Sequence, residues 1–300
     1  MASGKLKVLV YGATGVQANP LVGKLLQKGH LPYVMTRHPE KAEAMAKAGA
    51  KIIEGDINDA TPVGRANIGM DVVALTIPFL ASDQAGKNVI DAAKKAGVKL
   101  IVWNTSGMIP EQKGERHGLN VRMDNANYLK KSGIPCIIFQ PTVYLENLLL
   151  PDTAQLVVRE GIISYPTPAD KKVHWLASQD MAALMVTAME KPDLAGSHFV
   201  IGGEEAIDGN ELADSFSLAL GRNITYRPLS PADYAARLDK VMGKGNGRAI
   251  TGNSQKTTGK ESSAPDIRVD MKSVLEKLPI QMTSVTGWVR EYREFFNPIT

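Results

Sequence analysis

The sequence predicts an α/β fold, a doubly wound parallel sheet followed by a second, smaller α/β lobe in the C-terminal half. Two observations predict it. Short apolar runs alternate with stretches of helical periodicity through the first half of the chain, and these runs are apolar throughout, as strands buried on both faces are. Because a crossover between parallel strands is right-handed, a doubly wound sheet is the economical topology for this pattern.

The first half contains the expected strands of this sheet. They cover residues 5–11, 33–36, 51–54, 71–76, 100–104 and 136–139. Proline at the start of a helix, or glycine just past its end, marks the connecting helices. The residues that give these signals are Gly29, Pro39, Gly49, Gly97 and Gly133, and the last of these helices is expected over Leu119–Ser132.

The second half is less regular. Strands are expected at residues 161–165, 172–176 and 197–201, and the segment 172–203 is expected to return to the first domain. Ser178 fits the cap of a helix, and Asp208 with Glu211 has the form of a capping box for a helix that ends before Gly221. Ser230-Pro231 predicts a further helix start, and two short helices close the chain.

Residues 243–265 are polar, rich in glycine and nearly free of large apolar side chains. Such a segment buries too little surface to offset the entropy lost on ordering it. We therefore expect a mobile loop, either a lid or an insertion.

Composition excludes several classes of protein. The formal net charge is +4, with 44% hydrophobic and 22% charged residues, which excludes disordered, collagen-like and coiled-coil classes. No apolar run reaches the roughly 18 residues of a membrane span, and a single cysteine, Cys136, fits a reducing compartment, so we expect a cytoplasmic protein without a membrane partner. The lysine pairs are isolated and the histidines lack metal-ligand spacing, so neither nucleic acid nor a metal is expected.

The sharpest local signal is the segment Gly12-Ala-Thr14-Gly15-Val16-Gln17-Ala18, directly after the first strand. Gly12 allows a tight turn off the strand, and Gly15 allows a pyrophosphate to approach a backbone without a Cβ. The N–H groups that open the following helix then point at the phosphates. The alternative is a tight strand-to-helix turn with no ligand.

The cofactor preference depends on the residue about 20 positions beyond these glycines, where a dinucleotide fold meets the adenosine ribose. That residue is Arg37. An acidic residue would accept a hydrogen bond from a free 2′-hydroxyl, whereas arginine is a permanent planar cation suited to a 2′-phosphate. The sequence therefore predicts NADP(H), with His38 and Lys41 as further sources of charge.

Ligands of an open parallel sheet bind beyond the carboxyl ends of its strands. The residues at these ends are the expected cofactor contacts: Asp56, Ile57, Thr76, Pro78, Asn104, Thr105, Ser106, Pro141, Thr142 and Tyr144. Asp56 is placed to accept from the adenine amino group or, equally, to cap the following turn. Tyr144, Asn147 and Leu148 are expected to line an apolar and aromatic site for a flat aromatic substrate.

These residues are also the ones that make the chain recognisable. Gly12–Gln17, Thr36-Arg37, Glu54-Gly-Asp56 and Pro141–Asn147 together resemble the NmrA-like family, atypical members of the short-chain dehydrogenase/reductase superfamily. Ser178–Ala182 and Trp288–Tyr292 extend the resemblance over most of the chain. It implies an NADP(H)-binding Rossmann domain, here residues 1–155, and a smaller substrate and lid lobe over a cleft, here residues 156–300.

The resemblance leaves the catalytic residues open. An ordinary short-chain dehydrogenase site has a tyrosine with a lysine four residues on, and Tyr128 has Lys131 at a spacing of three instead. Where plant-ether reductases carry lysine, and dye and quinone reductases histidine, this chain has Arg122, which is a poor general acid. Asn125 stands near the place of the family's usual glutamate. The candidate catalytic residues are Arg122 and His117, the latter expected in the loop before this helix.

The leading hypothesis is an NADPH-dependent reductase of a small aromatic or conjugated electrophile, since family members reduce quinones, azo or triphenylmethane dyes, and phenolic ethers. The alternative is a regulatory protein of the NmrA type that senses NADP(H) without turnover. A third hypothesis is an isomerase or lyase that keeps the cofactor as a structural element. The partners considered are a small aromatic substrate, a second copy of the chain and, for a sensor, a protein partner.

Overall fold

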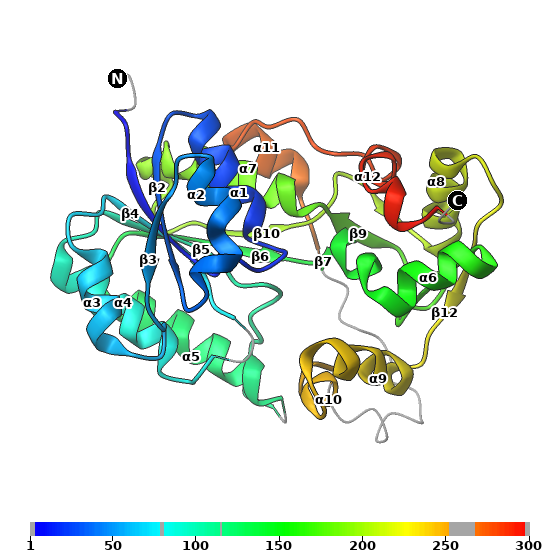
Figure 1. Cartoon of the computed structure of the whole chain (residues 1–300), viewed down its shortest axis with the longest axis horizontal. Helices are drawn as coiled ribbons and strands as arrows, with labels where there is room; N and C mark the ends of the chain where they lie inside the picture. The colour runs from blue at the N-terminus through cyan, green and yellow to red at the C-terminus, as the bar shows by residue number, and fades with distance from the viewer. Residues whose placement is uncertain (1–3, 79–80, 115, 252–267, 298–300) are drawn as a thin grey trace.

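The computed structural model describes residues 4–78, 81–114, 116–251 and 268–297. Within this part of the chain, seven parallel strands form one sheet in the order β10-β6-β5-β4-β1-β2-β3 (Figure 1). The strands are β1 (Lys7–Tyr11), β2 (Leu31–Thr36), β3 (Lys51–Glu54), β4 (Val72–Thr76), β5 (Leu100–Asn104), β6 (Cys136–Pro141) and β10 (His198–Ile201). The predicted doubly wound sheet is confirmed.

Helices cover both faces of this sheet, which is why its central strands are buried along most of their length. In β1, Val8 and Val10 pack with the helices on one face, and Leu9 and Tyr11 with those on the other. The first face carries α1 (Asn19–Gln27), α2 (Glu43–Lys47), α7 (Ser178–Met189) and α11 (Met271–Lys277), together with a 3₁₀ turn at Pro39–Ala42. The second face carries α3 (Ala60–Asn67), α4 (Ala85–Ala96) and α5 (His117–Ser132).

The helix α3 is not predicted from the sequence, and the amino-acid composition of this helix explains why. The helix contains threonine, proline, valine, glycine and asparagine, all weak helix formers. It is held by a cap, since the Asp59 side chain accepts from the Thr61 backbone N–H at 2.8 Å, and by packing, since Val63 and Ala66 are buried against the sheet. Tertiary packing therefore outweighs propensity here.

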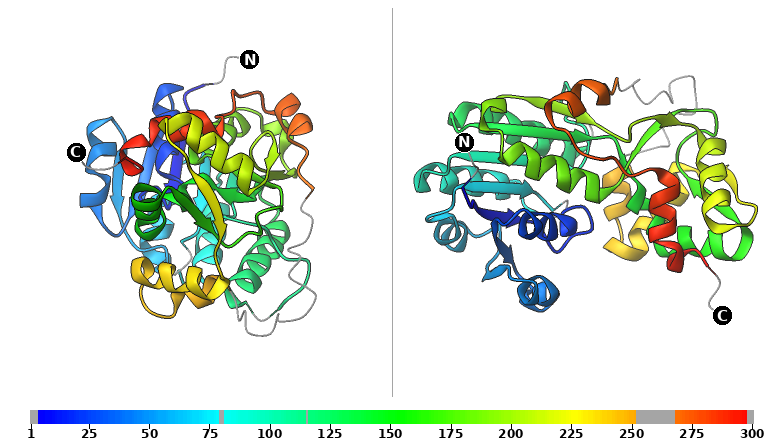
Figure 2. Two further views of the ribbon diagram at one scale, coloured as in Figure 1. Left: turned by 90° about the vertical axis from the view of Figure 1, so that its right-hand side faces the viewer. Right: turned by 90° about the horizontal axis from the view of Figure 1, so that it is seen from above.

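The smaller lobe continues from the carboxyl ends of the large sheet, because β6 leads directly into β7 (Figures 1 and 2). It contains a three-stranded and a two-stranded sheet, so β9 lies here and not in the large sheet. The strands are β7 (Val143–Tyr144), β8 (Ile162–Tyr165), β9 (Val173–Leu176), β11 (Ala206–Ile207) and β12 (Thr225–Pro228). The helices are α6 (Pro151–Glu160), α8 (Gly209–Leu220), α9 (Pro231–Met242), α10 (Asn246–Thr251) and α12 (Val285–Glu291), with 3₁₀ turns at Leu145–Leu149, Pro192–Leu194 and Arg293–Phe295.

A buried carboxylate joins the two lobes. Glu146 Oε1 accepts from the Ser178 backbone N–H at 3.0 Å, from the Ser178 hydroxyl at 2.8 Å and from the indole N–H of Trp288 at 3.0 Å. It thereby ties the segment after β7 to α7 and α12. Ser178 is consequently not the cap that the sequence analysis expects, because Ala177 holds that position and the serine hydroxyl is engaged by Glu146.

Part of the segment expected to be a mobile loop is helical. Residues 246–251 form α10, which packs on α9, and the Gly247 N–H donates to Asp239 Oδ1 at 2.6 Å. Residues 252–265 of that expected loop lie outside the described residues. None of the helices in the described part of the chain has the length and apolar character needed to cross a bilayer.

We predict that Asp208→Ala lowers the free energy of unfolding by about 1 kcal/mol. The Asp208 side chain accepts from the N–H groups of Asn210 and Glu211, and Glu211 reaches back to the Asp208 N–H, which completes the predicted capping box of α8. Urea denaturation measures the change. Asp214→Ala removes the same charge from an exposed position of α8, and the cap is refuted if both variants lose the same stability.

Candidate functional site

The turn after β1 is an open cradle of backbone N–H groups. Gly12 has φ +79°, and a Cβ built there would overlap the carbonyl oxygen of Thr76 at the end of β4. The Gly15 N–H closes the turn by donating to the Gly12 carbonyl at 2.9 Å. Among the described residues, the N–H groups of Val16 and Gln17 meet no protein acceptor, and α1 begins just beyond them without a side-chain cap. The turn can therefore accept an anion at the positive end of this helix.

A hollow beside this turn has the position expected for an adenosine moiety. It is lined by predicted cofactor contacts from four strand ends: Gly12, Thr14, Arg37, Ile57 and Pro78. The Arg37 side chain is 60% exposed, and its Nη1 lies 3.7 Å from Asp56 Oδ2. An exposed ion pair of this kind is weak, so the guanidinium is free to exchange its partner for a phosphate.

Asp56 itself is engaged in the turn that follows β3. Its Oδ1 accepts from the Asn58 backbone N–H at 2.9 Å and from the Asn58 side-chain amide at 2.8 Å. Asp56 does not line the hollow, although its neighbours Gly55 and Ile57 do. Of the two roles considered for Asp56, the geometry corresponds to the cap of the turn.

Asn104 organises the carboxyl end of β5. Its Oδ1 accepts from the Ser106 backbone N–H at 2.9 Å and from the Tyr144 hydroxyl at 3.2 Å. The hydrogen bond from the Ser106 N–H holds Ser106 at φ +58°. No other non-glycine residue in the described part of the chain has a positive φ. Burial raises the pKa of Tyr144, so its hydroxyl stays protonated and remains a donor. Asn104 is thus a positioning residue that is fully buried beneath the site.

A cleft of about 980 Å³ lies between the two lobes. Five of the residues predicted for cofactor or substrate line it: Gln17, Ser106, Thr142, Tyr144 and Asn147. Its volume suits a small organic molecule, and Gln17 places the turn after β1 at its edge. The cleft and the N–H cradle therefore form one continuous site.

Sequence reasoning missed much of the cleft wall. The residues it did not assign to the site include Met108, Glu111, Arg116, Tyr234, Met242, Ile250 and Arg268. They come from the β5–α5 connection, from α9 and α10, and from the segment before α11. The Arg116 guanidinium, for example, reaches across to the Ile250 carbonyl, with Nη1 at 3.3 Å. Only the tertiary fold brings these segments together, and no spacing in the sequence signals it.

Arg122 projects from α5 between this cleft and a second, smaller pocket. Its Nη1 donates to the Met108 carbonyl at 2.7 Å, and it passes so close to Gly107 that a Cβ there would lie 3.1 Å from Nη1. Burial, and the charge of Arg116, lower the pKa of Arg122 to about 10. The guanidinium is therefore still a cation at neutral pH.

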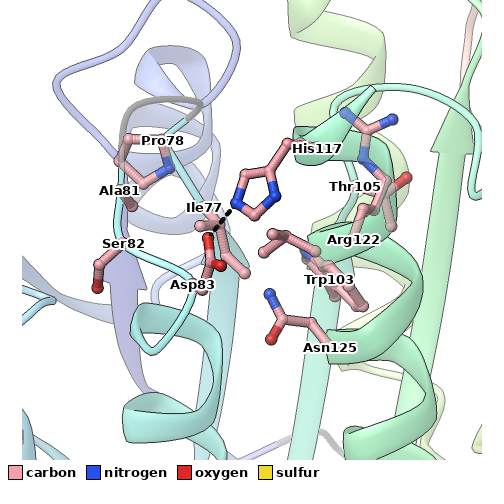
Figure 3. Close-up of a pocket in the computed structure, with 12 residues that line it drawn as sticks. Ile77, Pro78, Ala81, Ser82, Asp83, Trp103, Thr105, His117, Arg122 and Asn125 are labelled. Atoms are coloured by element: carbon pink, nitrogen blue, oxygen red, sulfur yellow. Dashed lines mark hydrogen bonds and ion pairs between the residues drawn. The ribbon is translucent and has the colours of Figure 1, made fainter. Parts of the chain in front are cut away.

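The smaller pocket lies between α5 and the segment after β4 (Figure 3). His117 Nε2 lies 2.8 Å from Asp83 Oδ1 across its mouth, and its side chain is 75% exposed. His117 is the first residue of α5 and not part of the preceding loop as expected. The helix begins two residues before the predicted start at Leu119. Its start was hard to predict because the N-cap residue, Arg116, makes no capping hydrogen bond and gives no signal in the sequence.

Asn125 closes the inner end of this smaller pocket. Its side chain packs so tightly on Gly86 that a Cβ there would lie 2.5 Å from the amide carbon. The Asn125 Oδ1 atom is buried and has no hydrogen-bond partner among the described residues. The amide thus fills the space beside α4 and leaves a buried oxygen without a hydrogen bond among the described residues.

Several predicted residues lie outside these hollows. Leu148 is only 1% exposed and belongs to the core of the smaller lobe, where the 3₁₀ turn directs it away from the cleft. Tyr128 does not line these hollows, and its hydroxyl donates to Asp91 at 2.8 Å. Cys136 does not line them either, and burial raises the pKa of its thiol. Gly15, Val16, Thr76, Asn104 and Pro141 support the site from the turn and the strand ends without lining these hollows. The described residues contain no metal-binding group of three His, Cys, Asp or Glu side chains.

Comparison with known proteins gives a consistent result. The model of the NmrA-like family matches residues 4–289. An NAD(P)H azoreductase of Xenophilus azovorans is 31% identical over 225 residues, which span 73% of this chain and 76% of that protein. Quinone oxidoreductase 2 of Escherichia coli is 26% identical over 245 residues, which span 78% of this chain and 82% of that protein.

Two solved structures share the fold. The NADPH complex of the Escherichia coli quinone oxidoreductase superposes with a TM-score of 0.73 at 23% identity and covers 95% of this chain and 99% of its own. The negative transcriptional regulator NmrA, in complex with NADP, superposes with a TM-score of 0.71 at 19% identity, covering 96% of this chain and 95% of its own. Both likenesses are likenesses of fold.

We predict that Gly12→Ala abolishes measurable binding of a pyridine dinucleotide, because the new methyl group would displace the backbone of the turn from Thr76. Gly23→Ala is the matched control. Gly23 is exposed in α1 with nothing within 4 Å of a built Cβ, so alanine there should leave binding unchanged and raise the free energy of unfolding by about 0.5–1 kcal/mol. Calorimetric titration with NADPH measures binding. Wild-type affinity in Gly12→Ala would contradict the account of the turn.

Proposed function

Because the chain belongs to the NmrA-like family, we propose that it is an NADPH-dependent reductase of a small aromatic or conjugated electrophile. The observation that carries this proposal is the continuity between the N–H cradle of the turn Gly12–Gln17 and an apolar and aromatic cleft. The azoreductase of Xenophilus azovorans and the quinone oxidoreductase of Escherichia coli support a reductase of the NAD(P)H-dependent kind. A quinone, an azo or related dye, or a phenolic ether-type compound are the acceptors we propose.

The residues present fit NADP(H). The glycine turn leaves room where a Cβ would not fit, and the N–H groups of Val16 and Gln17 are free to bind the diphosphate. We expect Arg37, which lines a hollow together with Ile57 and Pro78, to bind the 2′-phosphate. Thr105, Ser106 and Tyr144 lie at the carboxyl ends of β5 and β6, toward the nicotinamide end. When bound, NADPH supplies a hydride.

The side chains of the cleft orient the acceptor and exclude water from it. Tyr144 is fixed by its bond to Asn104, and Met108, Tyr165 and Tyr234 add apolar surface for a planar ring system. Arg122 has a pKa of about 10, so at neutral pH it orients an acceptor oxygen without giving up its proton. The proton comes from water or, for an acceptor that reaches past Arg122 into the smaller pocket, from His117, which Asp83 orients.

A second function, an NADP(H) sensor without turnover, is favoured by one specific observation. The described part of α5 has no tyrosine with a lysine four residues on, and the Tyr128 hydroxyl is occupied by Asp91. The likeness in fold to the regulator NmrA is compatible with this alternative. The sensor differs from the reductase in a measurable way, since it would bind cofactor tightly without consuming it.

We predict that Arg37→Glu weakens the binding of NADPH at least about tenfold, because one charge-assisted contact to the 2′-phosphate is lost and a like charge is introduced. NADH lacks this phosphate, and its affinity should change by less than about threefold. Fluorescence titration of both cofactors measures the ratio. Lys94→Glu makes the same change of charge on α4, away from the described hollows, and controls for net charge. Equal losses for NADPH and NADH would reject the assignment of Arg37.

We predict that the purified chain consumes NADPH with at least one acceptor from a panel of benzoquinones, naphthoquinones and azo compounds. The loss of NADPH absorbance measures the consumption. Tight binding of NADPH, no consumption with any acceptor and a protein that copurifies would contradict the reductase and favour the sensor.

We further predict that His117→Gln lowers kcat more than KM. The loss of kcat should be larger for an acceptor that needs a proton early in its reduction.

A further inference from the structure

Three arginines line the cleft between the lobes: Arg116, Arg122 and Arg268. Among the described residues of its lining, Glu111 is the one carboxylate, so the wall carries an excess of positive charge. None of the three arginines forms an ion pair within 4.0 Å in the described part of the chain. The whole chain has a formal charge of only +4, whereas the described lining of this one cleft carries three arginines and one carboxylate.

The partly buried Arg122 is the most informative of the three. One of its N–H groups donates to the Met108 carbonyl, and no carboxylate of the described residues lies within 4.0 Å of its guanidinium. Arg116 lies near enough to lower its pKa further. Placing two cations close together without a counter-ion is unfavourable, and the cost falls when an anion enters the site. A guanidinium also has the planar fork that binds carboxylate, sulfonate or phosphate oxygens in pairs.

Much of the remaining wall is aromatic and apolar. Tyr144, Tyr165 and Tyr234 line it, and the rings of Tyr165 and Tyr234 pack edge to face with centroids 5.2 Å apart. Met108, Ile109 and Ile250 add apolar side chains. The cleft therefore combines a surface suited to a flat conjugated body with arginine side chains suited to an acidic group.

We propose that the acceptor is a planar conjugated compound that carries an acidic substituent, a sulfonate, carboxylate or phosphate, held by Arg122 and Arg268 with Arg116. This inference rests on the proposed reductase function and narrows its substrate class. The cofactor's own diphosphate does not need these arginines, because the turn Gly12–Gln17 offers it free N–H groups.

The proposal is tested by binding, so that it does not depend on turnover. The full chain, saturated with NADP⁺, is titrated with anthraquinone-2-sulfonate and anthraquinone-2-carboxylate, and with their neutral sulfonamide and carboxamide. We expect each anion to bind at least about tenfold more tightly than its neutral partner, the size of one charge-assisted contact. Added salt should weaken the binding of the anions and leave the affinity for the neutral compounds unchanged.

The variants assign the effect to the cleft. Arg268→Gln and Arg122→Gln should each weaken the anions about tenfold and change the neutral compounds by less than about twofold. Arg227→Gln removes the same charge from an exposed position of β12 that does not line the cleft, and should change none of the four. Should Arg122→Gln fail to fold, Arg268→Gln and the salt series still decide.

The outcomes separate this inference from the function it rests on. The inference is overturned if no probe binds, or if the anions and the neutral compounds bind equally well. It is also overturned if Arg268→Gln weakens the binding of anionic and neutral compounds alike. A loss of NADP⁺ affinity in Arg122→Gln with unchanged probe selectivity would assign the arginine to the cofactor and overturn it as well. Anion-selective binding without NADPH consumption by any anionic acceptor would uphold the inference and contradict the reductase.

Discussion

The close approach of the Gly12 backbone to the end of β4 is the constraint on which the rest of the site depends. A side chain at this position would collide with the Thr76 carbonyl, and the φ of +79° suits glycine alone. Because β1 and β4 are neighbours in the centre of the sheet, this contact fixes the turn at the strand order's reversal. In a doubly wound sheet, that is where a crevice opens for a ligand. As a consequence of this turn, the N–H groups of Val16 and Gln17 face no acceptor among the described residues, and an anion can accept from them.

The second lobe adds the opposite wall and turns this crevice into a cleft. Its core is separate from the two cores of the large sheet, and Glu146 connects it to α7 through hydrogen bonds that are buried. Asp180 strengthens the same junction, because it accepts from the backbone and the hydroxyl of Thr283 ahead of α12. Glu146 and Asp180 therefore hold the lobes together, and the Arg116 guanidinium adds a contact to the Ile250 carbonyl on the cleft wall. This arrangement positions aromatic side chains from one lobe opposite the turn of the other.

The sheet and its helices could be predicted because each strand is an uninterrupted apolar run and glycine or proline marks most helix ends. The capping box at Asp208 and the cap at Ser230 are likewise local signals, and the structure contains both. The predictions that failed are those that depend on contacts between segments distant in the sequence. The helix α3 is formed by packing against propensity, α10 lies in a segment that is polar and glycine-rich, and Ser178 is drawn from its expected cap by Glu146. Of the site, the turn after β1 and the strand ends were accessible, since their roles follow from the order of elements. The arginines and tyrosines of the cleft come from segments spread over residues 116–268, and Leu148 turns into the core because a 3₁₀ turn changes its direction.

The measurement that tests this account most directly is a crystal structure of the full chain with bound NADP⁺. The account predicts that the diphosphate lies within hydrogen-bonding distance of the Val16 and Gln17 backbone N–H groups, and that the 2′-phosphate displaces Asp56 as the partner of the Arg37 guanidinium. A structure in which the nucleotide binds elsewhere, or in which Arg37 keeps its contact with Asp56 while the 2′-phosphate is exposed to solvent, would contradict it.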